Sequence, residues 1–389
     1  MIIRKEFLSY SPPSFDDKEV AAITQAIRSG WWSRGPKVAE FEKEFSRYIG
    51  VKHALAVNSC TAALHLALVA YGIGPGDEVI TTDMTFVSSA NVVIHCGARP
   101  VLVDIDENTG LIDPLRIEEK ISARTKAIIP VHYGGQPCHM DVINYIAGKH
   151  GLFVLEDAAH AVDTRYQGKI IGSGDNAVAF SFYATKNLAT GEGGMLTSPD
   201  AKFMEKARTL SLHGMNKDAW NRYAKGGSWR YDILVPGYKD NMSDIAASLG
   251  LVQLAKLPQM QKTRRRYAEI YDKAFAEIPG VQVLPPVENG VSAHHLYIIK
   301  IDPNLLTITR DEFIEQLAET YNVGTSVHFI PLHTFSYYKQ TFGYKKGSFP
   351  AAERFFSRVL SLPLYPAMQE EDVHYVAQAV RELATKYSK

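Results

Sequence analysis

The sequence predicts an α/β fold, with a large domain built on a mostly parallel seven-stranded sheet and a small C-terminal α+β domain. Short apolar runs alternate with helical patterns from residue 50 to about residue 200, as in a parallel sheet covered on both faces. A second, shorter alternation of strands and helices occupies the C-terminal part. The 389 residues also exceed the usual length of one domain. We therefore expect domains at 1–255, including an N-terminal arm, and at 256–389.

The strands of the large sheet are predicted from short runs that are apolar on both faces. The first run is followed by helical apolar spacing over 62–72. A hairpin-like excursion is expected over 164–175, between the fifth and sixth runs. The seven runs span 53–57, 78–82, 99–105, 125–134, 151–157, 177–182 and 193–199.

The chain changes character after residue 200. Residues 200–236 are polar and aromatic, and their GGSWRYD stretch suggests a loop. A helical period follows from Ser243 to about Ile278, which we interpret as two helices with a break near Pro258. The small domain is predicted to contain strands at 296–302 and 323–330 and helices at 309–322 and 370–387.

Composition narrows the class of protein. Lys plus Arg and Asp plus Glu each total 42, so net charge gives no reason to expect nucleic acid or an anionic membrane as partner. Three widely spaced cysteines, Cys60, Cys96 and Cys138, argue against a disulfide framework or a zinc site and favour a reducing compartment. The N-terminus lacks the apolar core of a signal peptide, and no apolar run approaches membrane-spanning length. A cytoplasmic protein is expected.

Two features near strand ends could bind a ligand. The stretch NSCTAALHLAL (58–68) is a Ser/Thr-rich turn before a helix, where free N–H groups can bind phosphate. The alternative is simple N-capping by Ser59 or Thr61. Asp157 ends an apolar strand, where ligands of α/β proteins bind. It could hold a cationic ring nitrogen or merely cap the next helix.

Two further features lie in FSFYATKNLATGEGG (180–194) and DMTFVSS (83–89). In the first, Ser181 suits a phosphate contact and Lys186 an imine, although a solvated loop lysine is the ordinary reading. The preceding aromatics and the glycines 191, 193 and 194 weigh against that reading, because glycines permit close approach of the backbone. In the second stretch, Phe86 could stack on a ring or belong to the core.

Together the four features suit one ligand, pyridoxal 5′-phosphate (PLP). A phosphate site at a helix start, a carboxylate, a stacking aromatic and a lysine are what a protein must supply to this cofactor. Taken singly, each feature has an ordinary explanation that is as good or better. The combination favours a PLP enzyme and predicts no metal.

Several long motifs follow one another along nearly the whole chain: GWWSRGPKVAEFEKEF (30–45), GDEVITTDMTFVSSANVV (76–93), AIIPVHYGG (127–135), EDAAHAVDTRYQGKIIGSGD (156–175), FSFYATKNLATGEGG (180–194), GYKDNMSDIAASLGLVQL (237–254) and SLPLYP (361–366). In these motifs the sequence resembles the sugar-nucleotide aminotransferases of the DegT family, which are fold type I PLP enzymes related in fold to aspartate aminotransferase. The motifs DAAHAV and GYKDN resemble most the branch that makes UDP-4-amino-4-deoxy-L-arabinose for lipid A modification.

The resemblance implies a role for each matching position. Lys186 matches the Schiff-base lysine and Asp157 the partner of the pyridine nitrogen. Phosphate contacts are implied for Ser181 and for the turn Ser59, Cys60 and Thr61, and ring stacking for Phe86.

Other positions are carried over with alternatives open. His160 stands where many members have Gln near the ring. Lys239 and Asn241 lie where the family reads GYNYRM, in a loop that reaches the active site of a neighbouring subunit. Substrate contacts are implied for Ser33, Arg34 and His328, of which His328 could equally be structural. No role is assigned to Glu192.

The implied activity is transfer of an amino group from L-glutamate, which leaves as 2-oxoglutarate, to a nucleotide-linked keto-sugar, most often a 4-keto sugar. The product would serve cell-surface polysaccharide, lipopolysaccharide or related amino-sugar biosynthesis, and a homodimer with interfacial active sites is implied. The alternatives are a sugar dehydratase, which carries His in place of Lys186, a PLP-binding regulator, and a dinucleotide-dependent oxidoreductase. The last is disfavoured because no GxGxxG follows the first strand.

Overall fold

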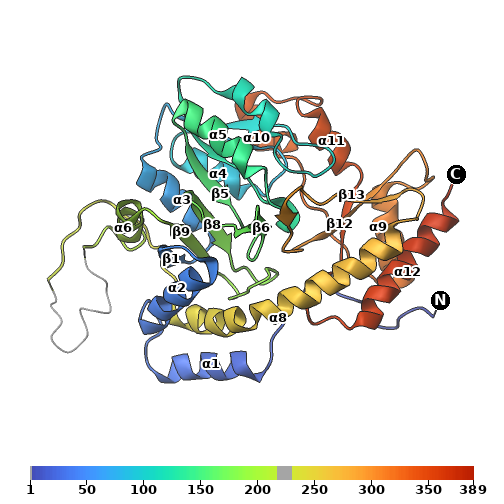
Figure 1. The fold of residues 1–389 in the computed structure, drawn as a ribbon, viewed down its shortest axis with the longest axis horizontal. Coiled ribbons are helices and arrows are strands. Elements are labelled where there is room, and N and C mark those ends of the chain that lie inside the picture. Colours follow the sequence, from blue (N-terminus) through green and yellow to red (C-terminus); the bar gives the residue numbers. More distant parts are fainter. Residues whose placement is uncertain (1, 217–229) are drawn as a thin grey trace.

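The structure is a computed structural model that describes residues 2–216 and 230–389. Its centre is a seven-stranded sheet in which β9 alone runs antiparallel to its neighbours, so the predicted sheet is confirmed (Figure 1). The strand order is β1 (His53–Val57), β9 (Gly194–Ser198), β8 (Ala177–Ser181), β5 (Phe153–Asp157), β4 (Thr125–Ile129), β2 (Glu78–Thr82) and β3 (Arg99–Val103). The predicted strand over 125–134 ends early because Pro130 has no N–H to continue the ladder.

Helices cover both faces of this sheet, as expected for a mostly parallel one. One face packs on α3, α4 and α6, and the other packs on α2 and α5. The helix bounds are α1 (Asp17–Arg28), α2 (Pro36–Ile49), α3 (Cys60–Tyr71), α4 (Ser88–His95), α5 (Met140–His150) and α6 (Ala201–Leu210). Short 3-10 turns are η1 (Pro114–Arg116), η2 (Glu118–Lys120), η3 (Tyr133–Gly135) and η4 (Leu332–Thr334).

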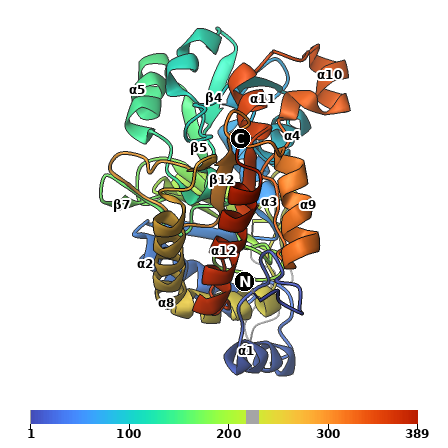
Figure 2. The ribbon, with the colours of Figure 1, turned by 90° about the vertical axis from the view of Figure 1, so that its right-hand side faces the viewer.

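The C-terminal part has its own antiparallel sheet, ordered β10-β12-β13, packed against α8, α9 and α12. In Figure 2, α12 runs down the middle of the view and α9 lies beside it, on its right. A third small sheet, β11-β6-β7, contains the predicted hairpin. The bounds are β6 (Arg165–Tyr166), β7 (Lys169–Ile170), β10 (Val281–Val283), β11 (Gly290–Val291), β12 (Tyr297–Ile301), β13 (Val359–Leu362), α8 (Asp244–Phe275), α9 (Arg310–Tyr321), α10 (Ser336–Phe342), α11 (Pro350–Phe356) and α12 (Glu370–Lys386).

The predicted break near Pro258 is wrong, because α8 is one continuous helix of 32 residues (Figure 1). Proline removes one backbone hydrogen bond and costs about 3 kcal/mol in a helix interior. Packing of α8 against α1, α2 and α12 offsets that cost. The proposed domain boundary between residues 255 and 256 falls inside this helix and remains a proposal.

Two other segments can be compared with the predictions. The polar and aromatic region 200–236 begins with α6, whose N-terminus is capped by Asp200. Most of the GGSWRYD stretch, where a loop was predicted, lies outside the described residues. The strand expected at 323–330 is absent from the described structure and makes only isolated bridges, at Val323 and Ser326. This segment instead makes tertiary contacts, such as the hydrogen bond from the Tyr133 hydroxyl to the carbonyl oxygen of His328.

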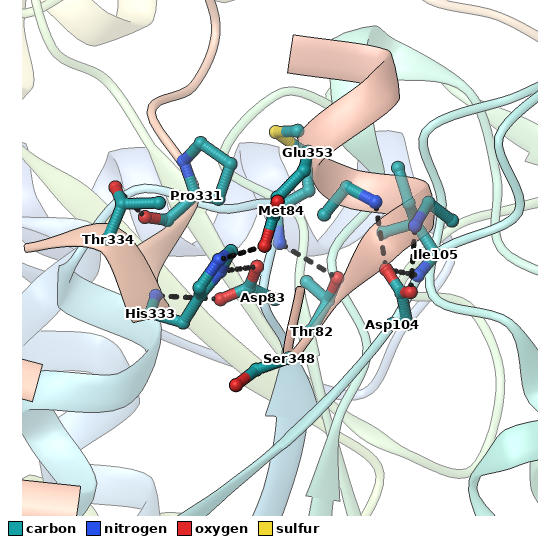
Figure 3. A network of polar contacts seen from close by, with 12 residues as sticks. Thr82, Asp83, Met84, Asp104, Ile105, Pro331, His333, Thr334, Ser348 and Glu353 are labelled. Atoms are coloured by element: carbon teal, nitrogen blue, oxygen red, sulfur yellow. Dashed lines mark hydrogen bonds and ion pairs between the residues drawn. The ribbon is translucent and has the colours of Figure 1, made fainter. Parts of the chain in front are cut away.

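Two buried aspartates at the carboxyl ends of β2 and β3 attach the C-terminal chain to the large sheet (Figure 3). The carboxylate of Asp83 accepts hydrogen bonds from the backbone N–H of His333 (2.8 Å) and from its ring Nδ1 (2.6 Å). Asp104 accepts the N–H groups of Ala351 and Ala352 at the start of α11. Burial alone would lower the pKa of His333, but hydrogen bonds to Asp83 and Glu353 outweigh it and raise that pKa.

We expect Asp83→Ala to lower the free energy of unfolding by about 3 kcal/mol, because it removes the partner of Nδ1 and of the backbone N–H of the buried His333 and leaves only Glu353 on Nε2. Urea denaturation monitored by circular dichroism measures this. The exposed Asp175→Ala is the control and should change stability by less than about 0.5 kcal/mol. Equal urea midpoints for the two variants would show that the contact between Asp83 and His333 does not stabilise the attachment of the C-terminal chain to the large sheet.

Candidate active site

A cavity of about 470 Å³ lies at the carboxyl edge of the central sheet. The strands β2, β4, β5 and β8 run parallel, and β1 runs with them because β9 is antiparallel to both β1 and β8. The segments that follow these strands therefore meet at one edge. The lining residues are Ser59, Cys60, Thr61, Thr85, Phe86, Ser88, Val131, Asp157, Ala159, His160, Ser181, Tyr183, Thr185, Lys186, Glu192, Gly193, His295, His328 and Phe329.

Lys186 lies in a turn after β8, with its backbone N–H donated to the carbonyl of Tyr183 (2.9 Å). Its half-buried side chain lines the cavity, and Nζ lies 3.5 Å from Nε2 of His295. Burial lowers the pKa of Lys186 to about 8, although Cys60 and Asp157 act in the opposite direction. The amine is therefore far easier to deprotonate at neutral pH than a surface lysine, as a nucleophile requires.

This lowered pKa predicts the pH dependence of covalent labelling at Lys186. Only the neutral amine attacks an aldehyde, so the rate constant for labelling by PLP should rise with pH and level off above about pH 8. Stopped-flow absorbance at a series of pH values, followed by borohydride trapping, measures the midpoint. A midpoint near 10.4, the value of an ordinary lysine, would contradict the burial.

Asp157 lies at the end of β5 with 3% of its surface exposed. Its carboxylate accepts a hydrogen bond from Ser89 Oγ (2.7 Å) and another from the backbone N–H of Ala159 (3.1 Å). Burial raises the pKa of Asp157 despite these bonds. The nearby Lys186 and His132 only partly offset the cost of burying this charge, so a protonated ring nitrogen beside the carboxylate fits the site.

The start of α3 forms another part of the cavity wall. Ser59 is the N-cap of α3, because its Oγ accepts the N–H of Ala62 (3.0 Å). The predicted alternative, N-capping by Ser59, is therefore confirmed. Capping satisfies one donor and leaves the first N–H groups of the helix for an anion. Strand β9 passes directly against this turn: a Cβ at Gly194 would lie 2.6 Å from the nitrogen of Cys60. The glycine thus permits contact with the turn itself rather than with a ligand.

The cavity wall also carries aromatic rings. Phe86 is 58% exposed, so it is not a core residue, and its ring lies 6.1 Å from that of Phe329. His160 accepts the N–H of Gly134 on Nδ1 (3.2 Å) and stacks on Phe329. His328 lines the cavity and is also hydrogen-bonded through Nδ1 to Ser361 Oγ (2.9 Å). Both readings of His328, structural and substrate-facing, thus have support.

Four of the predicted site residues do not line this cavity. Ser33 is exposed, and Arg34 is buried with Nη2 3.8 Å from Oε1 of Glu42. Lys239 and Asn241 are hydrogen-bonded to each other beside the α3 turn. Their predicted roles depend on a second subunit or on the bound substrate, and they remain predictions.

Several residues in or beside the cavity were not predicted from the sequence. Ser89, which binds Asp157, had a local signal, since it follows Phe86 by three residues in DMTFVSS. Tyr183 and Thr185 lie within the lysine stretch itself. His295 comes from a distant part of the chain, next to β12, and nothing near it in sequence marks it.

This fold and this cavity define a class, the PLP-dependent aminotransferases of fold type I. The chain matches the DegT/DnrJ/EryC1/StrS aminotransferase family over residues 13–381 and belongs to it. It is similar to the spore coat polysaccharide biosynthesis protein SpsC of Bacillus subtilis, at 56% identity over 381 residues and 98% of each chain.

Two solved structures are similar over nearly the whole chain. The PMP-form of Spr1654 from Streptococcus pneumoniae is 35% identical, with a TM-score of 0.91 over 97% of this chain and 99% of that one. DesI, solved in the presence of its TDP-sugar product, is 33% identical, with a TM-score of 0.87 over 98% and 94%. Among the described residues no helix is long and apolar enough to span a membrane, and no cluster of His, Cys, Asp or Glu suits a metal ion.

Proposed function

We propose that this enzyme transfers an amino group from L-glutamate to a nucleotide-linked keto-sugar, with a 4-keto sugar as the favoured acceptor. The observation that carries the proposal is the meeting of Lys186, Asp157 and the α3 turn in one cavity. The similarity to SpsC supports a product used in a cell-surface polysaccharide, and the TDP-sugar product of DesI supports a nucleotide-linked substrate. Lys186 favours transamination over sugar dehydration.

PLP fits the residues of the cavity. When bound, it supplies an aldehyde carbon that carries the amino group from donor to acceptor and a ring that accepts electrons. Asp157 would hold the ring nitrogen protonated, and the N–H groups of Cys60 and Thr61 with the hydroxyl of Ser181 would hold the phosphate. Phe86 would cover one ring face, and His160 lies close enough in the wall to contact the ring.

Lys186 has two tasks in this proposal. Its neutral amine would attach the cofactor. Once the amino donor has freed the lysine, the same amine would move the proton between the substrate carbon and the cofactor carbon that carries the amino group. Burial keeps a large fraction of this amine neutral near pH 8. The lining of the cavity by apolar and aromatic side chains such as Val131 and Phe329 limits the access of water.

We also propose a homodimer in the cytoplasm. Phe86 and Tyr183 are 58% and 48% exposed beside the cavity, which is unusual for large apolar side chains unless another surface covers them. A second subunit would also give Lys239 and Asn241 a site to reach. Glutamate and nucleotide sugars are both cytoplasmic metabolites, in agreement with this location.

The test is a panel of nucleotide-linked 3-keto and 4-keto sugars incubated with the PLP-loaded enzyme and L-glutamate. We expect 2-oxoglutarate to be released with a 4-keto sugar and an amino sugar to form in equal amount, as measured by mass spectrometry. If glutamate alone still changes the cofactor absorbance but none of the sugars in the panel supports continued release of 2-oxoglutarate, the proposed acceptor is rejected.

A further inference from the structure

A chain of buried polar side chains leads from the protein interior to Lys186. Asn187 donates from Nδ2 to the carbonyl of Ala293 (2.8 Å) and to Oε1 of Gln261 (3.0 Å). Gln261 also donates from Nε2 to the same carbonyl (3.2 Å). Because a carbonyl oxygen only accepts, Ala293 fixes the orientation of the Asn187 amide, and Oδ1 is left as an acceptor.

This orientation fixes the tautomer of His295. Its Nδ1 lies 3.1 Å from Oδ1 of Asn187 and must carry the hydrogen. Burial, with Lys186 and His160 nearby, holds the pKa of His295 well below its usual range, so the ring is neutral. A neutral ring has one N–H, so Nε2 bears a lone pair. This lone pair faces Nζ of Lys186 at 3.5 Å, where it can accept an N–H hydrogen bond.

The other two histidines of the cavity wall are arranged differently. His160 accepts the Gly134 N–H on Nδ1, so its remaining ring nitrogen carries the hydrogen and cannot accept from a lysine. His328 is bonded through Nδ1 to Ser361. Among the described residues, His295 is the cavity histidine whose ring nitrogen lies within hydrogen-bonding distance of Lys186 Nζ.

We propose that Asn187 and His295 are positioning residues that hold Lys186 with one N–H toward His295 and its lone pair toward the cavity. Lone pairs on two nitrogens repel, so an amine beside the Nε2 lone pair of His295 must present a hydrogen there. The free pair of Lys186 is then directed into the space that receives the substrate. This inference rests on the proposed role of Lys186 and extends it to the orientation of the base.

Several other groups act on the same amine. Burial lowers the pKa of Lys186, whereas Cys60 at the start of α3 and Asp157 at the end of β5 oppose this shift. The charge of Lys186 in turn contributes to the lowered pKa of three histidines, His160, His295 and His328. A test of His295 must therefore separate the hydrogen bond from the general field of the site.

The test uses apoprotein and PLP and needs no sugar. The aldehyde carbon forms a bond to Nζ with loss of water, and hydride from borohydride then reduces the C=N bond, which leaves a stable pyridoxyl group on the lysine. The rate constant of labelling is measured against pH for wild type, His295→Phe and His295→Gln. The control is His294→Asn, because His294 lies outside this cavity and its φ of +44° suits asparagine.

We expect His295→Phe to lower the midpoint by about one pH unit, because the ammonium form loses an acceptor. The plateau rate constant should fall about tenfold, because the lone pair is no longer directed. The carbonyl oxygen of His295→Gln can accept from the lysine, so this variant should restore most of the rate. Wild-type profiles are expected for His294→Asn.

Asn187→Asp is a second route to the same result. A carboxylate at this position favours the imidazolium form of His295, which turns Nε2 into a donor and removes the acceptor. The proposal is overturned if a variant that folds like wild type, either His295→Phe or Asn187→Asp, keeps the wild-type pH midpoint and the wild-type plateau rate constant of labelling. Labelling of wild type at a lysine other than Lys186 is a different result, which would reject the role of Lys186 itself.

Discussion

Lys186→Ala should lose covalent cofactor attachment and reduce turnover by at least about 10⁴-fold, because the variant lacks both the nucleophile and the general base. The visible absorbance of the PLP-loaded protein should become that of free PLP, and 2-oxoglutarate release should fall to background. The measurement combines absorption spectroscopy with the sugar panel described above.

The control for this variant is Lys202→Ala, which removes an exposed lysine from α6. It should keep wild-type absorbance and activity. Circular dichroism and a urea midpoint establish that Lys186→Ala is folded. A folded Lys186→Ala protein with activity comparable to wild type would remove the lysine from the mechanism.

Asp157→Asn should lower kcat by about 10²–10³-fold while PLP still attaches to Lys186. Asparagine keeps the shape of the side chain and can still accept from Ser89, but it cannot balance a positive charge on the ring nitrogen. Steady-state kinetics with glutamate and the preferred sugar measure the fall. Ser89→Ala, which removes one hydrogen bond from the same carboxylate, should cost only about tenfold.

The apoprotein should respond to Asp157→Asn in the opposite sense. Burial raises the folded-state pKa of Asp157 above the unfolded value of about 3.9, so the carboxyl group favours folding only at pH values where it is protonated. At neutral pH the buried charge therefore costs stability, and its removal should raise the urea midpoint. A lower midpoint together with lost activity would indicate a structural rather than a functional carboxylate.

Much of the fold follows from the sequence because its strands are buried on both faces. The runs predicted at 78–82 and 177–182 are confirmed as β2 and β8, and every residue of both strands is buried. Local patterns failed where tertiary packing decided the outcome. Pro258 is tolerated inside α8 because other helices pack along it, and 323–330 has strand periodicity but binds Tyr133 and Ser361 instead.

Part of the site could be predicted because the ends of parallel strands meet at one edge of a sheet. Asp157 and Ser181 end strands of one parallel sheet, and Ser59 and Lys186 lie in the segments that follow two of its strands, so all four converge at one edge. His295 could not be found in this way, because it reaches Lys186 from next to β12, in the C-terminal part of the chain. The predicted roles of positions such as Ser33 and Asn241, which lie outside this cavity, remain predictions.

Peptide mapping of the borohydride-reduced enzyme tests the central claim most directly. The PLP-loaded protein is reduced, digested and analysed by tandem mass spectrometry for the pyridoxyl group. We predict one modified residue, Lys186, in the segment FSFYATKNLATGEGG. A pyridoxyl group on another lysine, or a protein that reduction leaves unlabelled, would contradict the assignment of this cavity as the cofactor site.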